Sequence, residues 1–324
     1  MKTKETTFGV SQFVEYIEGK NLAKVTQNRY LKDLQRFFLW AKTEPEQVTK
    51  PDILKYLEYL KNHKGQQNKT RAISLVALSQ YFAFLLKAGQ ISKNPCAFIK
   101  IRGQKHKTIY KTYTTEELDE LFDNYYNVFI RNFDNSRQRG DYQRKLTALI
   151  RERNTLILNI LVNQGVITSE IEKIELGDID LSKATIKIRA SKKHNERTLA
   201  LKATQIGLFI NYLQNIRPQL FDLQKNIDNN KLFLATDRNN PKTKYKNFFR
   251  AMCNKLSKQI ETIDNQFLNF RQIRASVITN WLKIHGLRKT QYLAGHKHVT
   301  STEEYQQNNL DSLIDDINKL HPFL

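Results

Sequence analysis

A tyrosine near the C-terminal end of the chain follows a histidine at a spacing that could support chemistry. The segment Leu293-Ala294-Gly295-His296 is followed nine residues later by Tyr305. A phenol beside an imidazole in a strongly basic protein can attack a phosphodiester. The chain has 14 tyrosines, and most tyrosines in proteins are structural. Further cationic residues in the sequence are what make Tyr305 a candidate nucleophile.

These cationic residues lie upstream of the tyrosine. Arg271 and Arg274 are three residues apart in a stretch with helical spacing, and Lys192 lies in a basic turn. Attack on a phosphodiester needs donors on the non-bridging oxygens, because their charge grows in the transition state. Arginine offers a planar fork to two such oxygens. The set formed with His296 and Tyr305 therefore predicts a phosphoryl-transfer site.

The charge of the chain points to a polyanionic partner. It contains 53 Lys and Arg against 32 Asp and Glu, a net charge of +21. Residues 1–112 contain 21 basic and 8 acidic residues, which gives this part a net charge of +13. Such an excess most often means nucleic acid, and we expect double-stranded DNA as the partner. The length of 324 residues allows two domains, each with its own core.

The cysteines and the apolar segments exclude other classes. Cys96 and Cys253 lie far apart without the spacing of a zinc site or a disulfide framework, so we expect no metal. The first residues lack the apolar region of a signal peptide, and the longest apolar stretch, at 156–162, is much shorter than the roughly 20 residues that span a bilayer. These features predict a cytoplasmic protein with no membrane contact.

The first 100 residues have the periodicity of four or five helices. We expect helices at 8–17, from 26 with Thr26 as the cap, from 50 with Pro51 in the first turn, and at 70–86. The start of the fourth helix combines exposed amides with two cations, which could receive a backbone phosphate, although a solvated basic helix start is the alternative. The candidate DNA-binding residues at the starts of the second and fourth helices are Thr26, Asn28, Arg29, Lys69, Thr70 and Arg71.

Residues 99–113 lose this periodicity and are dense in cations, which is typical of a linker along a polyanion. We therefore predict a DNA-binding domain at 1–103, a basic linker at 104–113 and a second domain at 114–324. Arg102, Lys105 and Lys107 are further candidate DNA contacts.

The second domain is predicted to be mostly helical. Thr114 followed by two glutamates indicates a helix start, and two alternating segments at 185–189 and 196–201 flank a basic turn, which indicates a β-hairpin. Further helices are expected at 146–163, 205–214, 244–258, 271–282 and 310–320. The fold class is thus mainly α with a small β-sheet.

These motifs together resemble the tyrosine recombinase/integrase family, and the resemblance covers nearly the whole chain. Residues 165–170 fall where the family has Gly-x-Arg-x-x-Glu, and Lys192 falls on its hairpin lysine. Arg271 to Arg274 falls on the family's His-x-x-Arg, and Gly295-His296 to Tyr305 on its Gly-His and nucleophile. The resemblance implies a helical SAM-like core-binding domain and a catalytic domain with the DNA breaking-rejoining fold, which close around duplex DNA.

The resemblance also implies a mechanism. Tyr305 forms a 3′-phosphotyrosyl link and releases a 5′-hydroxyl, Arg274 and His296 hold the phosphate, and Lys192 protonates the leaving oxygen. No metal, cofactor or ATP is required, because the covalent link stores the bond energy. In the family a C-terminal helix docks on the neighbouring protomer, so the segment at 310–320 implies a homotetramer on two paired DNA sites, with accessory DNA-bending proteins as further partners. Packing of that helix on its own domain is the alternative.

Two positions depart from the family pattern. Ile167 stands where the family has its first catalytic arginine, and Arg271 stands where it usually has His or Lys. Loss of one such donor typically slows a reaction about a hundredfold to a thousandfold. We hypothesise that Arg189, on the hairpin just before Lys192, supplies the missing contact, with Arg271 as the second candidate.

The predicted function is a site-specific recombinase, more specifically the integrase of a mobile element. A chromosome-dimer resolvase and a type IB topoisomerase share the tyrosine chemistry, and relaxation of plasmid lacking a cognate site would favour the topoisomerase. In a different class, Ile167 would mark a degenerate accessory or architectural protein that binds DNA without cutting it. DNA affinity alone does not separate these functions, because the net charge predicts it for all of them.

Overall fold

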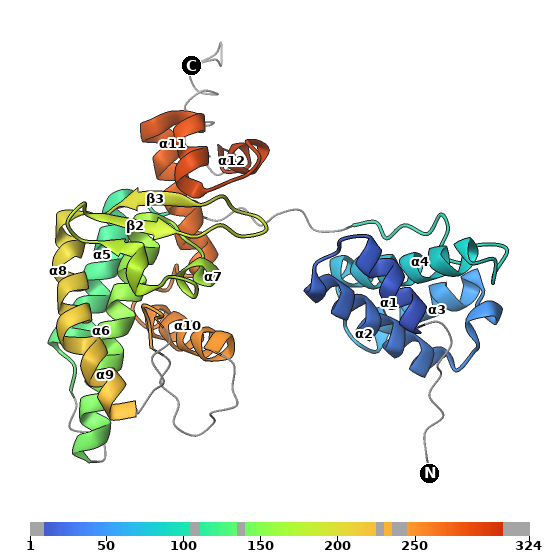
Figure 1. The fold of residues 1–324 in the computed structure, drawn as a ribbon, viewed down its shortest axis with the longest axis horizontal. Helices are drawn as coiled ribbons and strands as arrows, with labels where there is room; N and C mark the ends of the chain where they lie inside the picture. Colours follow the sequence, from blue (N-terminus) through green and yellow to red (C-terminus); the bar gives the residue numbers. More distant parts are fainter. Residues whose placement is uncertain (1–9, 104–110, 135–139, 225–229, 235–244, 307–324) are drawn as a thin grey trace, which may run out of the picture. The chain divides into compact units, whose positions relative to one another are not determined.

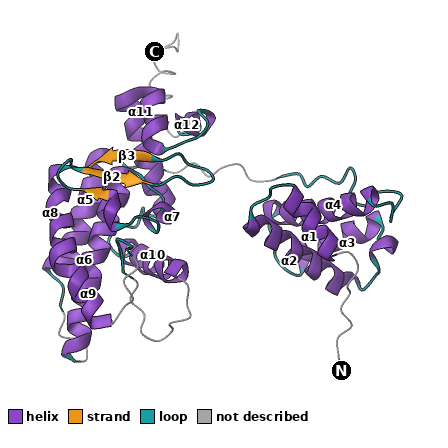
Figure 2. Cartoon of the chain, in the orientation of Figure 1, coloured by secondary structure: helices purple, strands orange, loops and turns teal. Residues whose placement is uncertain are grey.

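The computed structural model describes residues 10–103, 111–134, 140–224, 230–234 and 245–306 (Figure 1). The chain divides into two compact units, Met1–Thr108 and Ile109–Leu324. Helices dominate both units, and the second also contains a small sheet (Figure 2). The predicted class, mainly α with a small β-sheet, is confirmed. Over the described ranges, no helix combines the length and the apolar character needed to cross a bilayer.

The first unit is a helical bundle with an aromatic core. Its helices are α1 (Val10–Gly19), α2 (Lys24–Ala41), α3 (Lys50–Asn62) and α4 (Asn68–Lys87), with a 3₁₀ turn at Pro45–Gln47. Helices α2 and α4 make the most extensive contact. The rings of Phe37 and Tyr56 meet edge to face, with centroids 5.0 Å apart. Aromatic pairs of this kind add to the free energy gained by burying apolar surface.

Local sequence explains where these helices begin. Thr49 precedes α3, its backbone N–H donates to the Asp52 carboxylate at 3.0 Å, and Pro51 lies in the first turn as predicted. The predicted cap of α2 is wrong. Helix α2 begins at Lys24, after Ala23 in an extended conformation, so Thr26 lies inside the first turn and cannot cap the helix.

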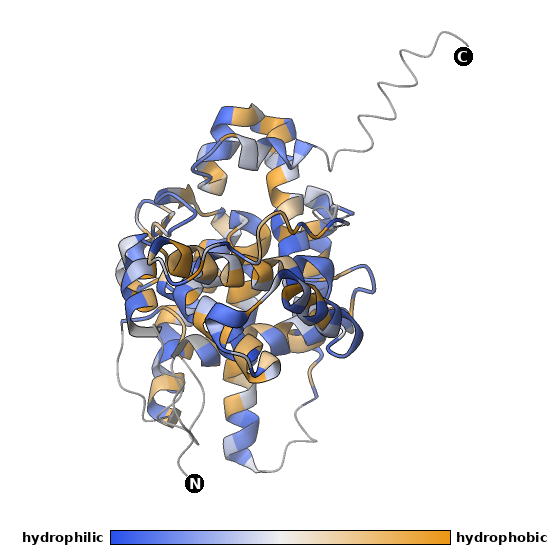
Figure 3. Ribbon diagram, turned by 90° about the vertical axis from the view of Figure 1, so that its right-hand side faces the viewer, coloured by the Kyte–Doolittle hydropathy of each residue, from blue (hydrophilic) through white to orange (hydrophobic). Residues whose placement is uncertain are grey.

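The second unit is built around α6, a helix of 24 residues whose C-terminal half is buried almost throughout. Helices α5, α9 and α11 pack against it. Figure 3 shows hydrophobic and hydrophilic residues interspersed along the helices of the chain, as expected for helices that bury one side. The helices are α5 (Thr115–Tyr126), α6 (Asp141–Gln164), α7 (Thr168–Ile171), α8 (Ala203–Asn211), α9 (Arg217–Gln224), α10 (Tyr245–Glu261), α11 (Phe270–Ala294) and α12 (Thr300–Glu303), with π turns at Asn127–Arg131 and Tyr212–Ile216 and a 3₁₀ turn at Leu176–Asp178.

A three-stranded antiparallel sheet carries the predicted hairpin. Its strands are β1 (Ile179–Asp180), β2 (Thr185–Ile188) and β3 (Arg197–Ala200), in the order β1-β2-β3. Ile188 pairs with Arg197 across the hairpin, and both side chains lie on the buried face. A strand turns successive side chains to opposite faces, so the register decides which cations of the hairpin enter the interior.

Helix α11 is longer than the predicted segment 271–282. The side chain of Asn269 caps its start by accepting from the backbone N–H of Arg271 at 2.9 Å. Gly286 interrupts the helix with φ +70° and ψ −179°, and the chain then continues in helical form to Ala294. Gly295, also with φ +70°, ends it in the left-handed conformation that glycine tolerates best.

The start of α5 gives a stability prediction. The hydroxyl of Thr114 accepts from Glu117 N at 3.2 Å, and the Glu117 carboxylate accepts from Thr114 N at 2.7 Å. Thr114→Ala removes one of these bonds, so we expect the free energy of unfolding of the second unit to fall by about 1 kcal/mol. The measurement is denaturant unfolding, with Thr115→Ala, at the next and exposed position, as the control. Equal losses in both variants would contradict the capping role.

Candidate active site

Arg274 lies at the centre of the candidate site. Helix α11 carries it into the interior, where the residue is 4% exposed. One terminal nitrogen donates to the carbonyl oxygen of Gly165 at the end of α6, and the other to that of Ala294 at the end of α11 at 2.9 Å. Burial lowers the pKa of Arg274, while Glu170 and Tyr305 raise it. Two backbone carbonyls therefore fix a buried guanidinium that still has further N–H donors.

Tyr305 and His296 lie against this guanidinium. Tyr305 lies near enough to Arg274 to help raise the pKa of its guanidinium. Its ring stacks on that of His296, with centroids 5.7 Å apart and an interplanar angle of 14°. The distance from His296 Nε2 to Arg274 Nη2 is 3.2 Å. The structure thus brings together the predicted nucleophile, imidazole and arginine.

The contacts of His296 assign its tautomer. Arginine can only donate, so Nε2 of His296 accepts from Arg274. The proton of a neutral ring is then on Nδ1, which lies 2.9 Å from the hydroxyl oxygen of Thr302. For Nε2 to donate to a phosphate, the ring must gain a second proton or exchange tautomers.

The buried carboxylate of Glu170 lies next to Arg274 on the interior side of the site. It accepts from both terminal nitrogens of Arg197, at 2.9 and 3.2 Å, and from the backbone N–H of Ile167 at 3.0 Å. Arg274 Nη1 is 3.7 Å away. Burial alone would raise the pKa of Glu170, but His194, Arg197 and Arg274 hold it well below the usual range. Glu170 is therefore a charged acceptor between two guanidinium groups.

The β2–β3 loop is fastened to the segment after α11. Asn195 N donates to the carbonyl oxygen of Gly295 at 2.8 Å, and His194 pairs with His296 in an isolated antiparallel bridge. A Cβ at position 295 would lie 2.5 Å from a terminal nitrogen of Arg197. Glycine is thus required there both for the turn and for the close approach of that arginine.

The other predicted catalytic residues lie around the cluster. Lys192 is exposed on the β2–β3 loop, and Arg271 is exposed one turn before Arg274. Within the described ranges neither side chain bonds to the cluster. Arg189 is ion-paired with Glu175 at 2.7 Å and with Asp178 at 2.9 Å. Its substitution for the missing arginine remains a prediction, and it would require these two pairs to break.

Two residues of the site were missed from the sequence, His194 and Arg197. The alternation of the hairpin contains the signal for Arg197, because it shares the inward-facing positions of β3 with Leu199. An arginine at an inward position requires a buried partner. That partner, Glu170, lies 27 residues earlier in the chain.

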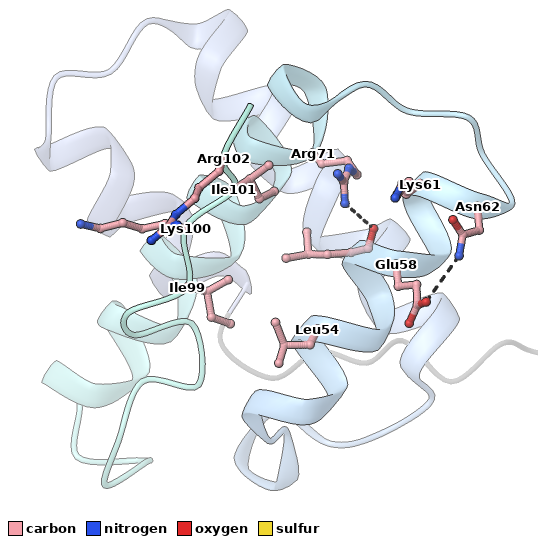
Figure 4. Close-up of a pocket in the computed structure, with 10 residues that line it drawn as sticks. Leu54, Glu58, Lys61, Asn62, Arg71, Ile99, Lys100, Ile101 and Arg102 are labelled. Atoms are coloured by element: carbon pink, nitrogen blue, oxygen red, sulfur yellow. Dashed lines mark hydrogen bonds between the residues drawn. The ribbon is translucent and has the colours of Figure 1, made fainter. Parts of the chain in front are cut away.

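In the first unit, cations line an open groove between α3, the start of α4 and residues 99–102 (Figure 4). Two of these cations, Arg71 and Arg102, were predicted. The sequence analysis missed Lys61 and Lys100. The Asn68 amide donates to the carbonyl oxygen of Arg102 at 2.8 Å, so the start of α4 holds this strand-like segment in place.

The remaining DNA-binding candidates are less clearly grouped. Arg29 bonds to the buried carboxylate of Asp33 at 2.6 Å, which engages its guanidinium. Asn28 and Lys69 are exposed, whereas Thr26 and Thr70 are half-buried. Lys105 and Lys107 lie outside the described residues.

Comparisons with known proteins agree with this geometry. Residues 139–311 match the model of the phage integrase family, and residues 10–90 match the SAM-like N-terminal domain of phage integrases. The SAM-like N-terminal domain expected from the sequence is thereby confirmed.

Among the described residues, no group of His, Cys, Asp and Glu could hold a metal ion.

Two curated relatives match over almost their whole length. The tyrosine recombinase XerC of Natranaerobius thermophilus is 26% identical over 319 residues, covering 96% of this chain and 97% of the relative. The XerC of Thermodesulfovibrio yellowstonii is 26% identical over 325 residues, covering 98% and 97%.

Two solved structures share the fold. The XerH recombinase bound to a palindromic difH substrate has a TM-score of 0.64 at 19% identity, covering 92% of this chain and 80% of that one. The Tn1549 transposon integrase in complex with a circular intermediate DNA has a TM-score of 0.60 at 16% identity, covering 96% and 98%.

The buried carboxylate gives a second stability prediction. Glu170→Gln leaves the Arg197 guanidinium buried without a counter-charge, so we expect the free energy of unfolding to fall by about 3–5 kcal/mol at neutral pH. The folded-state pKa of Glu170 is depressed, so its stabilisation is complete above about pH 4.5 and is lost as the pH falls further. The loss relative to wild type should therefore shrink in acid.

The control is Glu196→Gln, which removes the partner of Lys187 in an exposed pair and should cost less than about 1 kcal/mol. The measurement is urea unfolding of both variants between pH 3 and 7. Similar losses in the two variants would contradict a special role for the buried carboxylate.

Proposed function

The chain belongs to the phage integrase family, and from this premise we propose that it is a site-specific DNA recombinase with Tyr305 as its nucleophile. As a member of this family it is a DNA strand transferase, which cleaves and rejoins DNA strands. The observation that carries the assignment of the nucleophile is the stacking of the Tyr305 ring on that of His296, whose Nε2 lies 3.2 Å from a terminal nitrogen of the buried Arg274. A phosphate bound by Arg274 and His296 would therefore lie beside the phenol.

In the proposed reaction, a DNA phosphate enters between these two side chains. A non-bridging oxygen accepts a hydrogen bond from Arg274, and the oxygen of Tyr305 attacks the phosphorus while its proton passes to water. The bond from phosphorus to the 5′ oxygen breaks, and a 3′-phosphotyrosyl link forms. Lys192, exposed on the β2–β3 loop, protonates the leaving oxygen. Attack of a 5′-hydroxyl on the phosphotyrosyl link reverses the step and joins the strand to its new partner.

The fixed position of the Arg274 guanidinium supports this chemistry. Two of its donors are fixed by the carbonyl oxygens of Gly165 and Ala294, so the group needs little rearrangement as charge develops on the phosphate. Preorganised donors in a site shielded from water are worth more than the same donors in solution. His296 adds a donor once its ring carries the second proton.

We propose double-stranded DNA as the substrate, bound by both domains. The net charge of +21 supports this, as do the structures of the XerH recombinase and the Tn1549 integrase, which were solved with DNA. The proposed organisation is a core-binding domain at 1–103, a basic linker at 104–113 and a catalytic domain at 114–324. The homotetramer on two paired sites and the docking of the segment at 310–320 on a neighbour remain part of the proposal, since that segment lies outside the described residues.

The proposed biological role is integration or excision of a mobile element. The irregular position Ile167 motivates this assignment. A chromosomal resolvase is the second candidate, because relatives that match at least 96% of the chain are named XerC. The DNA site that the protein cleaves distinguishes the two roles.

The covalent intermediate gives the central test. We expect wild-type protein to form a covalent adduct with a nicked suicide substrate, and Tyr305→Phe to form none, because phenylalanine has no oxygen to attack the phosphorus. Gel electrophoresis under denaturing conditions detects the adduct, and DNA from the ends of the encoding element and from chromosomal recombination sites supplies the substrates. Tyr292→Phe, at an exposed tyrosine of α11, is the matched control and should form the adduct.

If neither wild type nor Tyr305→Phe forms an adduct on any of these sites, the strand-transferase proposal fails. The degenerate DNA-binding protein is then the better description. Relaxation of plasmid lacking a cognate site would instead favour a topoisomerase.

The groove of the first unit gives a second test. If Lys100 and Arg102 each neutralise one phosphate, removing both should weaken DNA binding and reduce the magnitude of the slope of log K against log salt by about 2. The measurement is binding at several salt concentrations, with Lys93→Ala, an exposed lysine outside the groove, as the control. An unchanged slope in the Lys100→Ala/Arg102→Ala variant would show that the groove does not face DNA.

A further inference from the structure

Position 167 leaves the proposed site without one phosphate donor. Ile167 has no polar side-chain atom, and its backbone N–H is already bonded to the Glu170 carboxylate at 3.0 Å. A phosphate bound by Arg274 would therefore lack a contact on this side. The structure contains a side chain that can supply it.

That side chain is His194, on the loop between β2 and β3. Its Nδ1 lies 3.3 Å from Oε1 of Glu170, at ion-pair distance but without the alignment of a hydrogen bond. The other oxygen of the same carboxylate accepts the N–H of Ile167. One carboxylate thus contacts both the imidazole of His194 and the backbone of residue 167. The ring therefore lies close to the point where an arginine side chain at position 167 would leave the backbone.

The loop holds His194 firmly. Its backbone N–H donates to the Ser191 hydroxyl at 3.0 Å, and its carbonyl oxygen accepts from Ser191 N at 2.8 Å. The bridge to His296 brings the two rings to 5.9 Å between centroids. The side chain is 14% exposed, so it is accessible to a ligand at the surface of the site.

The other cations near Glu170 are less suited to this role. The side chain of Arg197 is 0% exposed, and both of its terminal nitrogens are bonded to Glu170. Arg189 is held by two carboxylates that precede β1 in the chain, Glu175 and Asp178. Arg197 therefore positions Glu170, and His194 remains as a side chain that can both pair with Glu170 and reach outward.

We propose that His194 is a further catalytic residue, which donates a hydrogen bond to the scissile phosphate in place of the arginine absent at position 167. The inference rests on the proposed strand-transfer function. In its protonated form the ring donates through Nδ1 to Glu170 and through Nε2 to a non-bridging oxygen. Its charge then offsets part of the negative charge that grows on the phosphate.

The test measures single-turnover formation of the covalent adduct at saturating protein. We expect His194→Ala to slow it about a hundredfold to a thousandfold at pH 6. His194→Gln keeps a neutral donor toward Glu170 but no charge, so it should remain slow at pH 6. His298→Ala, at an exposed histidine on the same segment as His296, is the matched control and should equal wild type.

A rescue variant separates the donor role from a structural one. Ile167→Arg restores a donor at the family position, so His194→Ala should cost much less in that background than in wild type. Thermal unfolding and DNA affinity of each variant report whether folding is retained. Wild-type rates in His194→Ala or in His194→Gln would overturn the inference while leaving the proposed function in place. Absence of any adduct with wild-type protein would overturn both.

Discussion

The candidate site depends on one buried carboxylate. Glu170 accepts from both arms of Arg197 and lies 3.7 Å from Arg274, so it balances two guanidinium groups that would otherwise be buried without a counter-charge. Burying an unpaired charge costs several kcal/mol. With the carboxylate present, the protein can place Arg274 in the interior at low cost and hold it still. A fixed guanidinium is what a reaction at phosphorus requires, because its donors do not have to reorient as charge develops.

Much of the architecture follows from local sequence. The helical periodicity, the proline and acids in the first turns and the alternation of the hairpin predict the elements within a few residues. Spacing also predicts that Arg274, His296 and Tyr305 belong together, and they do lie in one cluster. These features are predictable because each is encoded within a single helix, turn or motif.

The features that the sequence analysis missed depend on contacts between distant segments. Arg189 and Arg197 look alike as cations of one hairpin, but the strand register turns Arg197 inward to Glu170, whereas Arg189 pairs with Glu175 and Asp178. Alternation alone could have separated the two arginines. The cap of α2 was predicted wrongly because an extended alanine, Ala23, starts that helix without any side-chain cap. The proximity of His194 to Glu170 depends on the hairpin loop packing beside α7, which local sequence does not encode.

The β2–β3 loop is fastened to Gly295 and His296, and this attachment limits how the nucleophile can move. Main-chain contacts join the two segments, so the loop that carries Lys192 cannot separate from the turn that carries His296 unless these contacts break. Tyr305 lies beyond this junction, after the short helix α12. Residues 297–305 connect this junction to the nucleophile, and Thr302 among them contacts Nδ1 of His296 at 2.9 Å. Displacement of Tyr305 together with this segment would therefore also release the imidazole from its fixed orientation.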